Sequence, residues 1–242
     1  MDHVIGLFRL WWIPAGGGPT QGTYIRYDHE AMVGILALEA HRAAALVVGE
    51  DLGTVEPWVR DYLRERGILG TSILWFEFDW DGDGSPLAPE KWRKYCLASV
   101  TTHDLPPTAA YLAGDHVRLR DRLGILTRSL AEELAVDETE RQAWLDNLRH
   151  RGLLLDDAGE QETIHALHRY LTLTPSRLLC VALTDAVGDR EAQNQPGTVD
   201  EYPNWRVPLT GPDGSVMLLE DVMSSDRVAA LAREVSAGRR LD

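Results

Sequence analysis

Short apolar runs and longer amphipathic stretches alternate along this chain. Strands are predicted where an apolar run is bounded by turn residues, at residues 43–48, 71–79, 96–102 and 178–183. Helical spacing of apolar residues is clearest at about residues 29–44 and 225–237. Because strands that alternate with helices pair side by side in the same direction, the pattern predicts an α/β fold with a parallel sheet.

The run at residues 43–48 is followed directly by two carboxylates, Glu50 and Asp51. An uninterrupted apolar run of this length is typical of a strand buried on both faces. A helix is expected next, with Thr54 as its cap and Pro57 in its first turn. In barrel enzymes the catalytic groups lie at the carboxyl ends of strands, so this position favours a catalytic role over a structural one.

Acidic residues also follow two of the other predicted strands, at Asp104 and Asp185, and Asp2 precedes an apolar stretch. Carboxyl ends of parallel strands share one edge of a sheet, so we expect these acids to gather there. Glycosidic chemistry requires a carboxylate nucleophile and a carboxylic acid on either side of one bond. A divalent cation would suit the same acids equally well.

A charge-rich segment at about residues 107–173 has helical spacing and little strand character. It is several times longer than an ordinary connection between a strand and a helix. We predict helices at residues 117–134 and 138–149, joined near Val136 and Asp137, and a third at about residues 160–171. Together they should form a helical insertion beside the sheet.

Composition excludes several classes of partner. The formal net charge of −14 argues against nucleic acid, which requires a basic face. No apolar run approaches the length of a membrane span. The two cysteines, Cys96 and Cys180, lie in apolar segments and do not make a disulfide framework, which favours a reducing compartment and a cytoplasmic location.

One segment matches the EF-hand calcium loop pattern, through Asp79, Asp81, Asp83, Gly84 and Glu90. A strand rather than a helix is predicted before it, and two prolines interrupt it. We therefore interpret it as a solvent-exposed loop. His165 and His168, on a predicted helix, are likewise expected to be surface or packing residues rather than metal ligands.

The chain enters an apolar and aromatic stretch immediately after Met1, Asp2 and His3. The first residues of a complete domain are usually polar and loosely held. We therefore expect the chain to be truncated at its N-terminus.

Four segments carry a resemblance to a known family: DHVIGLFRLWWIP, GEDLGTVEPWVRDYL, VTTHDLPPTAAYLAG and PNWRVPL. They resemble the 4-α-glucanotransferases, also called amylomaltases or disproportionating enzymes, which form family 77 of the glycoside hydrolases and are related to the α-amylases. The resemblance spans essentially the whole chain and is strongest to the actinobacterial branch. It implies that residues 1–242 are the C-terminal portion of a TIM (β/α)₈ barrel, about strands 4–8, with the helical insertion before the last strand. The missing N-terminal part of the same barrel is then its implied partner.

The resemblance also implies roles for individual residues. Asp2 matches the nucleophile of the family's Arg-x-Asp-His segment, Glu50 matches the acid/base, and Asp104 matches the acid that stabilises the transition state. The family arginine two places before the nucleophile is absent from this chain. The residues implied to bind substrate are His3, His103, Asn204 and Trp205.

The implied reaction transfers α-1,4-glucan segments to the 4-hydroxyl of an acceptor by a retaining double displacement, with no metal and no organic cofactor. The implied ligands are α-1,4-glucans and maltooligosaccharides. Trp11, Trp12, Tyr24 and Trp205 could stack on sugar rings, although core packing is the favoured interpretation for Trp11 and Trp12. An α-glucan hydrolase with the same acids and a non-catalytic, metal-binding half-barrel stay open as alternatives. Residues 1–242 by themselves are expected to be inactive.

Overall fold

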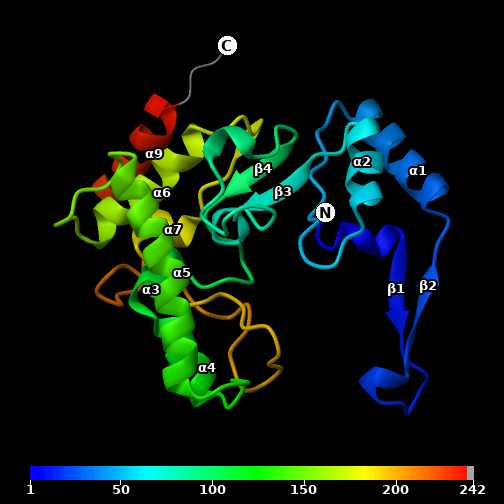
Figure 1. Ribbon diagram of the computed structural model, residues 1–242, viewed down its shortest axis with the longest axis horizontal. Helices are drawn as coiled ribbons and strands as arrows, with labels where there is room; N and C mark the ends of the chain where they lie inside the picture. The colour runs from blue at the N-terminus through cyan, green and yellow to red at the C-terminus, as the bar shows by residue number, and fades with distance from the viewer. Residues whose placement is uncertain (239–242) are drawn as a thin grey trace. The chain divides into compact units, whose positions relative to one another are not determined.

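The computed structural model describes residues 1–238 (Figure 1). The chain divides into two compact units, which are treated separately below. The first consists of Met1–Ser72 and Arg93–Leu97, and the second of Ile73–Trp92 and the chain from Ala98 onward. None of the helices in the described part of the chain combines the length and the apolar character that a membrane span requires.

The first unit opens with an antiparallel hairpin that the sequence did not predict, with Arg9 opposite Arg26 and Trp12 opposite Thr23. Two helices pack against the start of the chain around a small apolar core, formed by Val4, Phe8, Val33, Val59, Leu63 and Ile68. The elements are 3₁₀ helices Val4–Leu7 and Pro19–Gln21, β1 (Arg9–Trp12), β2 (Thr23–Arg26), α1 (His29–Arg42) and α2 (Pro57–Glu65).

The helix predicted at residues 29–44 is confirmed as α1. The helix after the carboxylates also forms, as α2, but Thr54 is not its cap. Glu56 occupies that position without a side-chain hydrogen bond, and Pro57 is the first helical residue. Proline fits there because its missing N–H is one of those that a helix start leaves unpaired in any case.

The strand predicted at residues 43–48 is wrong over most of its length. The backbone N–H groups of Ala43, Ala44 and Ala45 bond to carbonyls of α1, so these alanines form the turn that ends the helix, and Ala44 adopts a left-handed φ of 50° there. A short apolar run does not by itself distinguish such a turn from a buried strand. The run is also not buried on both faces, because Leu46 is 71% exposed.

A short parallel pairing begins only at the end of this run. Val48 forms a parallel bridge with Leu69, through Leu69 N to Val47 O at 3.0 Å and Gly49 N to Leu69 O at 2.8 Å. On its other side, the Met1 amino group donates to Val48 O at 2.8 Å, and Glu50 N donates to Met1 O at 2.8 Å. The start of the chain and the segment that ends on Glu50 therefore lie side by side.

Three strands form a sheet in the order β3 (Gly70–Ile73), β4 (Cys96–Ser99) and β5 (Leu178–Leu179). The arrows of β3 and β4 point the same way in Figure 1. Each strand is shorter than predicted. After β3 a 3₁₀ helix, Leu74–Phe76, turns Leu74 and Trp75 into the core of the second unit. After β5 the chain enters a short helix, α7 (Leu183–Val187).

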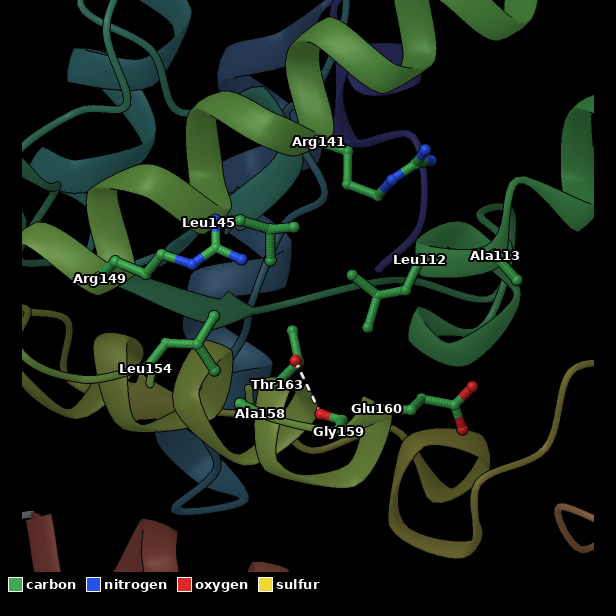
Figure 2. A pocket seen from close by; sticks show the side chains of 10 residues that line it. All are labelled: Leu112, Ala113, Arg141, Leu145, Arg149, Leu154, Ala158, Gly159, Glu160 and Thr163. Atoms are coloured by element: carbon green, nitrogen blue, oxygen red, sulfur yellow. Dashed lines mark hydrogen bonds between the residues drawn. The ribbon is translucent and has the colours of Figure 1, made fainter. Parts of the chain in front are cut away.

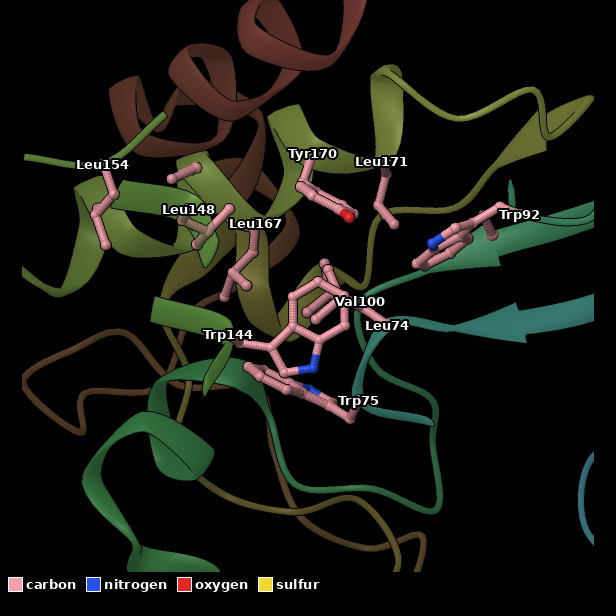
Figure 3. Packing of buried hydrophobic residues seen from close by; sticks show 12 residues of the cluster. Leu74, Trp75, Trp92, Val100, Trp144, Leu148, Leu154, Leu167, Tyr170 and Leu171 are labelled. Atoms are coloured by element: carbon pink, nitrogen blue, oxygen red, sulfur yellow. The ribbon is translucent and has the colours of Figure 1, made fainter. Parts of the chain in front are cut away.

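Helices dominate the second unit. They pack around a core centred on Trp144, Leu167 and Tyr170, to which α5, α6, β4 and the 3₁₀ helix after β3 contribute (Figure 3). The remaining elements are 3₁₀ helix Pro89–Lys91, α3 (Thr108–Ala113), α4 (Asp115–Arg122), α5 (Leu130–His150), α6 (Glu160–Thr172), α8 (Leu219–Ser224) and α9 (Asp226–Gly238).

The predicted helix break near Val136 and Asp137 is wrong, because α5 runs through both residues. The break lies earlier, where Gly124 adopts a left-handed φ of 68° after α4. Glycine takes this conformation without strain and commonly ends a helix. Ser129 then starts α5 with a capping box. The helices predicted at residues 160–171 and 225–237 are confirmed as α6 and α9.

Candidate active site

Asp2, His3 and Glu50 come together in the first unit. One side-chain oxygen or nitrogen from each residue lies within 4.8 Å of those of the other two. His3 N donates to Glu50 Oε2 at 3.0 Å, and Leu52 N donates to Glu50 Oε1 at 2.6 Å. The His3 ring nitrogen Nδ1 lies 3.0 Å from Asp2 Oδ2. The structure thus brings together two of the three predicted catalytic carboxyl groups.

The backbone produces this arrangement. The pairing of Met1 with residues 48–50 fixes the two segments in register, and Val4 N adds a bond to Glu50 O at 3.0 Å. His3 has a left-handed φ of 46°, which is uncommon for a residue other than glycine. The N–H of the same residue donates to the Glu50 carboxylate. The Asp2 side chain is 54% exposed, so it is open to an incoming ligand.

Asp51, next to Glu50, has a different environment. It is only 2% exposed and accepts hydrogen bonds from both terminal nitrogens of Arg93, at 2.6 and 3.1 Å. Thr71 N donates to its Oδ1 at 2.9 Å. Gly70 leaves room for this pair, because a Cβ there would lie 2.7 Å from Arg93 Nη1 and 2.7 Å from Asp51 Oδ2. Asp51 therefore anchors the turn that carries Glu50 to β3.

The third predicted acid, Asp104, belongs to the second unit and lies in the loop after β4. Its Oδ1 accepts a hydrogen bond from Asn194 Nδ2 at 2.6 Å, and its Oδ2 lies 3.5 Å from His103 Nε2. The His103 ring lies 5.4 Å from the Trp205 ring, and Trp205 is 63% exposed. Convergence of Asp104 with Asp2 and Glu50 stays a prediction.

Asn194 is a candidate site residue that the sequence reasoning missed. It lies in the irregular loop before residue 208, where no periodicity distinguishes one polar residue from another. Asn204, which was predicted to bind substrate, uses its side chain within the same loop. Its Oδ1 accepts from Gln195 N at 2.8 Å, and its Nδ2 donates to Thr198 Oγ1 at 2.9 Å.

Asp185, the fourth acid, is not on an open edge of the sheet. It lies in α7, is 1% exposed, and both of its oxygens accept hydrogen bonds from Thr108. It lies on the helix that follows β5, so the prediction that a strand ends on Asp185 is wrong, and its carboxylate is used in the interior of the second unit.

The two tryptophans of the hairpin are exposed rather than packed in a core, so that interpretation is also wrong. Trp12 is 57% and Trp11 45% exposed. Trp11 meets Tyr24 edge to face at 5.0 Å between ring centroids, and the Arg9 guanidinium lies 4.0 Å from the centre of the Tyr24 ring. Each indole N–H has a partner, Pro19 O for Trp11 and Tyr27 Oη for Trp12. The hairpin thus presents aromatic faces to solvent.

The acids of the EF-hand-like segment have protein partners of their own. Asp79 pairs with Lys91 at 2.6 Å, and Asp83 accepts from Ser85 N at 2.9 Å. Within residues 1–238, the group with the spacing of metal ligands is Asp2, His3 and Glu50 instead. His168 is buried, and its Nδ1 lies 2.8 Å from Ile164 O.

A pocket of about 250 Å³ opens in the second unit between α3, α5 and α6 (Figure 2). Leu112, Leu145 and Leu154 form its apolar wall, and Arg149 and Glu160 lie among its polar residues. None of the predicted site residues lines it, so it is separate from the candidate active site.

Comparison with known proteins yields close relatives. A 4-alpha-glucanotransferase of Mycobacterium tuberculosis is 68% identical over 241 residues, which cover 98% of this chain and 33% of that protein. One of Haemophilus influenzae is 31% identical over 251 residues, covering 100% of this chain and 34% of that protein. The chain therefore spans about a third of the length of the curated relatives it matches.

Solved structures agree. The crystal structure of amylomaltase from Corynebacterium glutamicum matches with a TM-score of 0.91 and 46% identity, over 100% of this chain and 35% of that one. The amylomaltase from Streptococcus agalactiae in complex with acarbose matches over 98% of this chain and 40% of that one. Its TM-score of 0.68 at 17% identity shows likeness of fold alone. The family model described as 4-alpha-glucanotransferase matches residues 1–213, and this chain accordingly belongs to that family.

Proposed function

We propose that this chain carries the catalytic centre of a 4-α-glucanotransferase. The observation that supports the proposal best is the proximity of Asp2 and Glu50, since one side-chain oxygen of Asp2 lies within 4.8 Å of one side-chain oxygen of Glu50. Retaining glycosidases hold their two carboxyl groups about 5–5.5 Å apart, because the nucleophile must reach the sugar carbon while the acid reaches the departing oxygen. The pair in this chain suits that requirement.

In the proposed reaction, an Asp2 oxygen attacks the anomeric carbon of an α-1,4-linked glucan. The bond from that carbon to the glycosidic oxygen breaks, and Glu50 gives its proton to the departing oxygen. A covalent glucosyl ester of Asp2 results. Glu50 then takes the proton of the 4-hydroxyl of a second glucan, whose oxygen displaces Asp2 and regenerates the carboxylate.

Asp104 is the proposed stabiliser of the positive charge that develops on the sugar ring, and Asn194 holds its carboxylate in place at 2.6 Å. His103 is a proposed ligand of a sugar hydroxyl, with the exposed Trp205 ring beside it as a stacking surface. In this proposal, residues 1–242 form about strands 4–8 of a (β/α)₈ barrel. The proposed partner is the part of the barrel that precedes them in relatives, and a cytoplasmic location stays a prediction.

A chimera tests the proposal. This chain replaces the matching third of the Mycobacterium tuberculosis relative, and the purified chimera is incubated with maltotriose. Chromatography of the products should show a ladder of longer and shorter maltooligosaccharides. Glu50→Gln should lower the rate at which the ladder forms by at least about a hundredfold, since acid/base catalysis alone contributes a factor of about 10²–10⁴ to the rate.

Glu56→Gln is the matched control, because Glu56 lies in the same unit but pairs with Arg9 at 3.3 Å rather than with the candidate site. It should leave the ladder intact. Products that are only shorter than maltotriose would favour the α-glucan hydrolase. A Glu50→Gln chimera as active as the parent would refute the assignment of the acid/base.

A second candidate function is favoured by one observation. The spacing of Asp2, His3 and Glu50 would also suit a divalent cation, with one nitrogen and two carboxylate ligands. Calorimetry of the chain with calcium and with zinc separates the metal-binding function from the transferase function. Tight binding that is lost in Asp2→Asn, in a chimera without transferase activity, would favour the metal-binding alternative.

A further inference from the structure

The loop that carries Asp104 leads directly into α3, and the start of that helix is bonded in an unusual way. Pro107 occupies the cap position, and no side-chain cap is formed there. The first backbone N–H groups of a helix have no acceptor within the helix, and burying such an N–H without any acceptor is unfavourable. Thr108 N is nevertheless satisfied, because it donates to Asp185 Oδ1 at 2.8 Å from a distant helix.

The same carboxylate takes a second bond from the same residue. Thr108 Oγ1 donates to Asp185 Oδ2 at 2.6 Å. Thr108 and Asp185 are 0% and 1% exposed, so water does not compete for these bonds. A two-point contact of this kind fixes both the position and the rotation of the first residue of α3 relative to α7.

The Asp104 loop is closed on itself between two fixed ends. Ser99 Oγ donates to Thr101 O at 2.8 Å, and Thr101 Oγ1 donates to Pro106 O at 2.9 Å. Leu105 N donates to Thr102 O at 3.2 Å. One end of the loop is β4, and the other is the Thr108–Asp185 contact, so a shift at Thr108 is transmitted to Asp104.

A third element, α6, also contacts the Asp185 carboxylate. His168 on α6 is 1% exposed, and its Nε2 lies 3.7 Å from Asp185 Oδ2. Its other ring nitrogen is held by Ile164 O at 2.8 Å. A buried carboxylate requires such partners, because its desolvation is otherwise costly.

We propose that Asp185 is a positioning residue for Asp104: by capping α3 from α7, it holds the end of the loop that presents the transition-state carboxylate. The inference rests on the proposed function for its effect on rate. It assigns Asp185 no contact with substrate, and it makes Thr108 the residue through which Asp185 acts.

The first test uses the full chain and does not depend on activity. In Thr108→Val, which keeps the side-chain shape and removes the Oγ1 bond, hydrogen exchange of the amides at residues 102–105 and 108 should accelerate about tenfold. Exchange within α5 should be unchanged. Thr108→Ser should restore the slow rate, because serine can donate the same bond. Unchanged exchange at residues 102–105 and 108 in Thr108→Val would overturn the inference.

The second test uses the chimera described above and a matched control. Thr163 is another buried threonine of the second unit, whose Oγ1 donates to Gly159 O at 2.8 Å within α6 (Figure 2). Thr108→Val should lower kcat about ten- to hundredfold with little change in KM, since misalignment affects the transition state more than ground-state binding. Thr163→Val should lower thermal stability and leave kcat unchanged.

These outcomes separate the two proposals. If the unsubstituted chimera lacks transferase activity, the proposed function fails while the exchange experiment still decides whether Asp185 holds the loop. If the chimera is active and Thr108→Val and Thr163→Val reduce kcat equally, the role of Asp185 in positioning Asp104 is wrong.

Discussion

Two adjacent carboxylates have different roles at the turn after residue 49. Glu50 and Asp51 are neighbours in sequence, yet one faces the candidate site and the other is buried against Arg93. Successive residues in extended backbone point to opposite sides, so two adjacent carboxylates naturally separate into a reactive and an anchoring one. The sequence could predict that separation but not the partner of Asp51, because Arg93 lies 42 residues away.

Replacing the anchor should destabilise the first unit. Asp51→Ala leaves the Arg93 guanidinium and Thr71 N without their shared acceptor, and loss of one partner of a buried pair costs about 3–5 kcal/mol. Because the Arg93 side chain is 35% exposed, the lower end is expected, about 3 kcal/mol in the free energy of unfolding. Urea titration followed by tryptophan fluorescence measures it.

Asp61→Ala is the matched control, since Asp61 forms an exposed pair with Arg64 one turn along α2. Exposed pairs of this kind contribute about 0.3–0.5 kcal/mol. Equal losses for Asp51→Ala and Asp61→Ala would contradict the anchoring role.

The identities of Asp2, Glu50 and Asp104 as candidates came from motifs, and the proximity of Asp2 to Glu50 agrees with that assignment. Asn194 and the Thr108–Asp185 contact could not be found in the same way. Both depend on loops that meet across long sequence separations, and a single asparagine or threonine has no periodic pattern to reveal its partner.

Helices and strands differ in how much of them the sequence predicts. Apolar spacing found α1, α6 and α9 nearly to the residue, because each repeats apolar residues at helical spacing over three turns or more, although only α6 buries a continuous face. The strands are four residues or fewer, and runs that short do not distinguish a strand from a helix end or a 3₁₀ turn. The hairpin β1–β2 was missed for a similar reason, since both of its strands have exposed side chains on both faces.

The start of α5 offers a test of helix capping. Ser129 Oγ accepts from Glu132 N at 3.3 Å, and Glu132 accepts from Ser129 N at 3.0 Å. Ser129→Ala should lower the free energy of unfolding by about 1 kcal/mol. Thr139→Ala removes an exposed hydroxyl from the middle of the same helix and should stabilise slightly, because alanine is the better helix former there. Thermal unfolding should show a lower midpoint temperature for Ser129→Ala and a slightly higher one for Thr139→Ala than for the parent chain.

The packing of α6 against α9 should make stability depend on pH. Burial lowers the pKa of His165, and the carboxylate of Glu234 offsets only part of that effect. The folded state therefore favours neutral His165. Its contribution to stability is fully present above the unfolded pKa of about 6.5, and it is lost as pH falls through the lower folded value.

His165→Gln removes this titration. Between pH 7.5 and pH 5, the parent chain should lose more of its free energy of unfolding than the variant, as measured by urea titration at each pH. Parallel losses in the two proteins would show that His165 does not contribute.

Over its described residues, the chain exposes several large apolar side chains. Leu46, Ile35 and Trp12 are 71%, 62% and 57% exposed, and the chain spans about a third of the length of its relatives. The 242 residues expressed by themselves should therefore self-associate, because exposed apolar surface and unpaired strand edges favour association. They should also fail to disproportionate maltotriose.

Light scattering and product analysis on the same sample check both statements. A monodisperse monomer with ordinary enzyme rates, about 1–10³ per second, would contradict the expectation. It would mean that the part of the relatives that this chain does not cover is dispensable for the reaction.

The close approach at Gly70 has an evolutionary consequence. An alanine there would press on both Asp51 and Arg93, so it is harmful while that pair is present and harmless only after one member has become smaller. The effect of a substitution at one of the three positions should therefore depend on the residues at the other two. Drift in this part of the sequence should be found as coordinated replacements, with a side chain at position 70 arriving last.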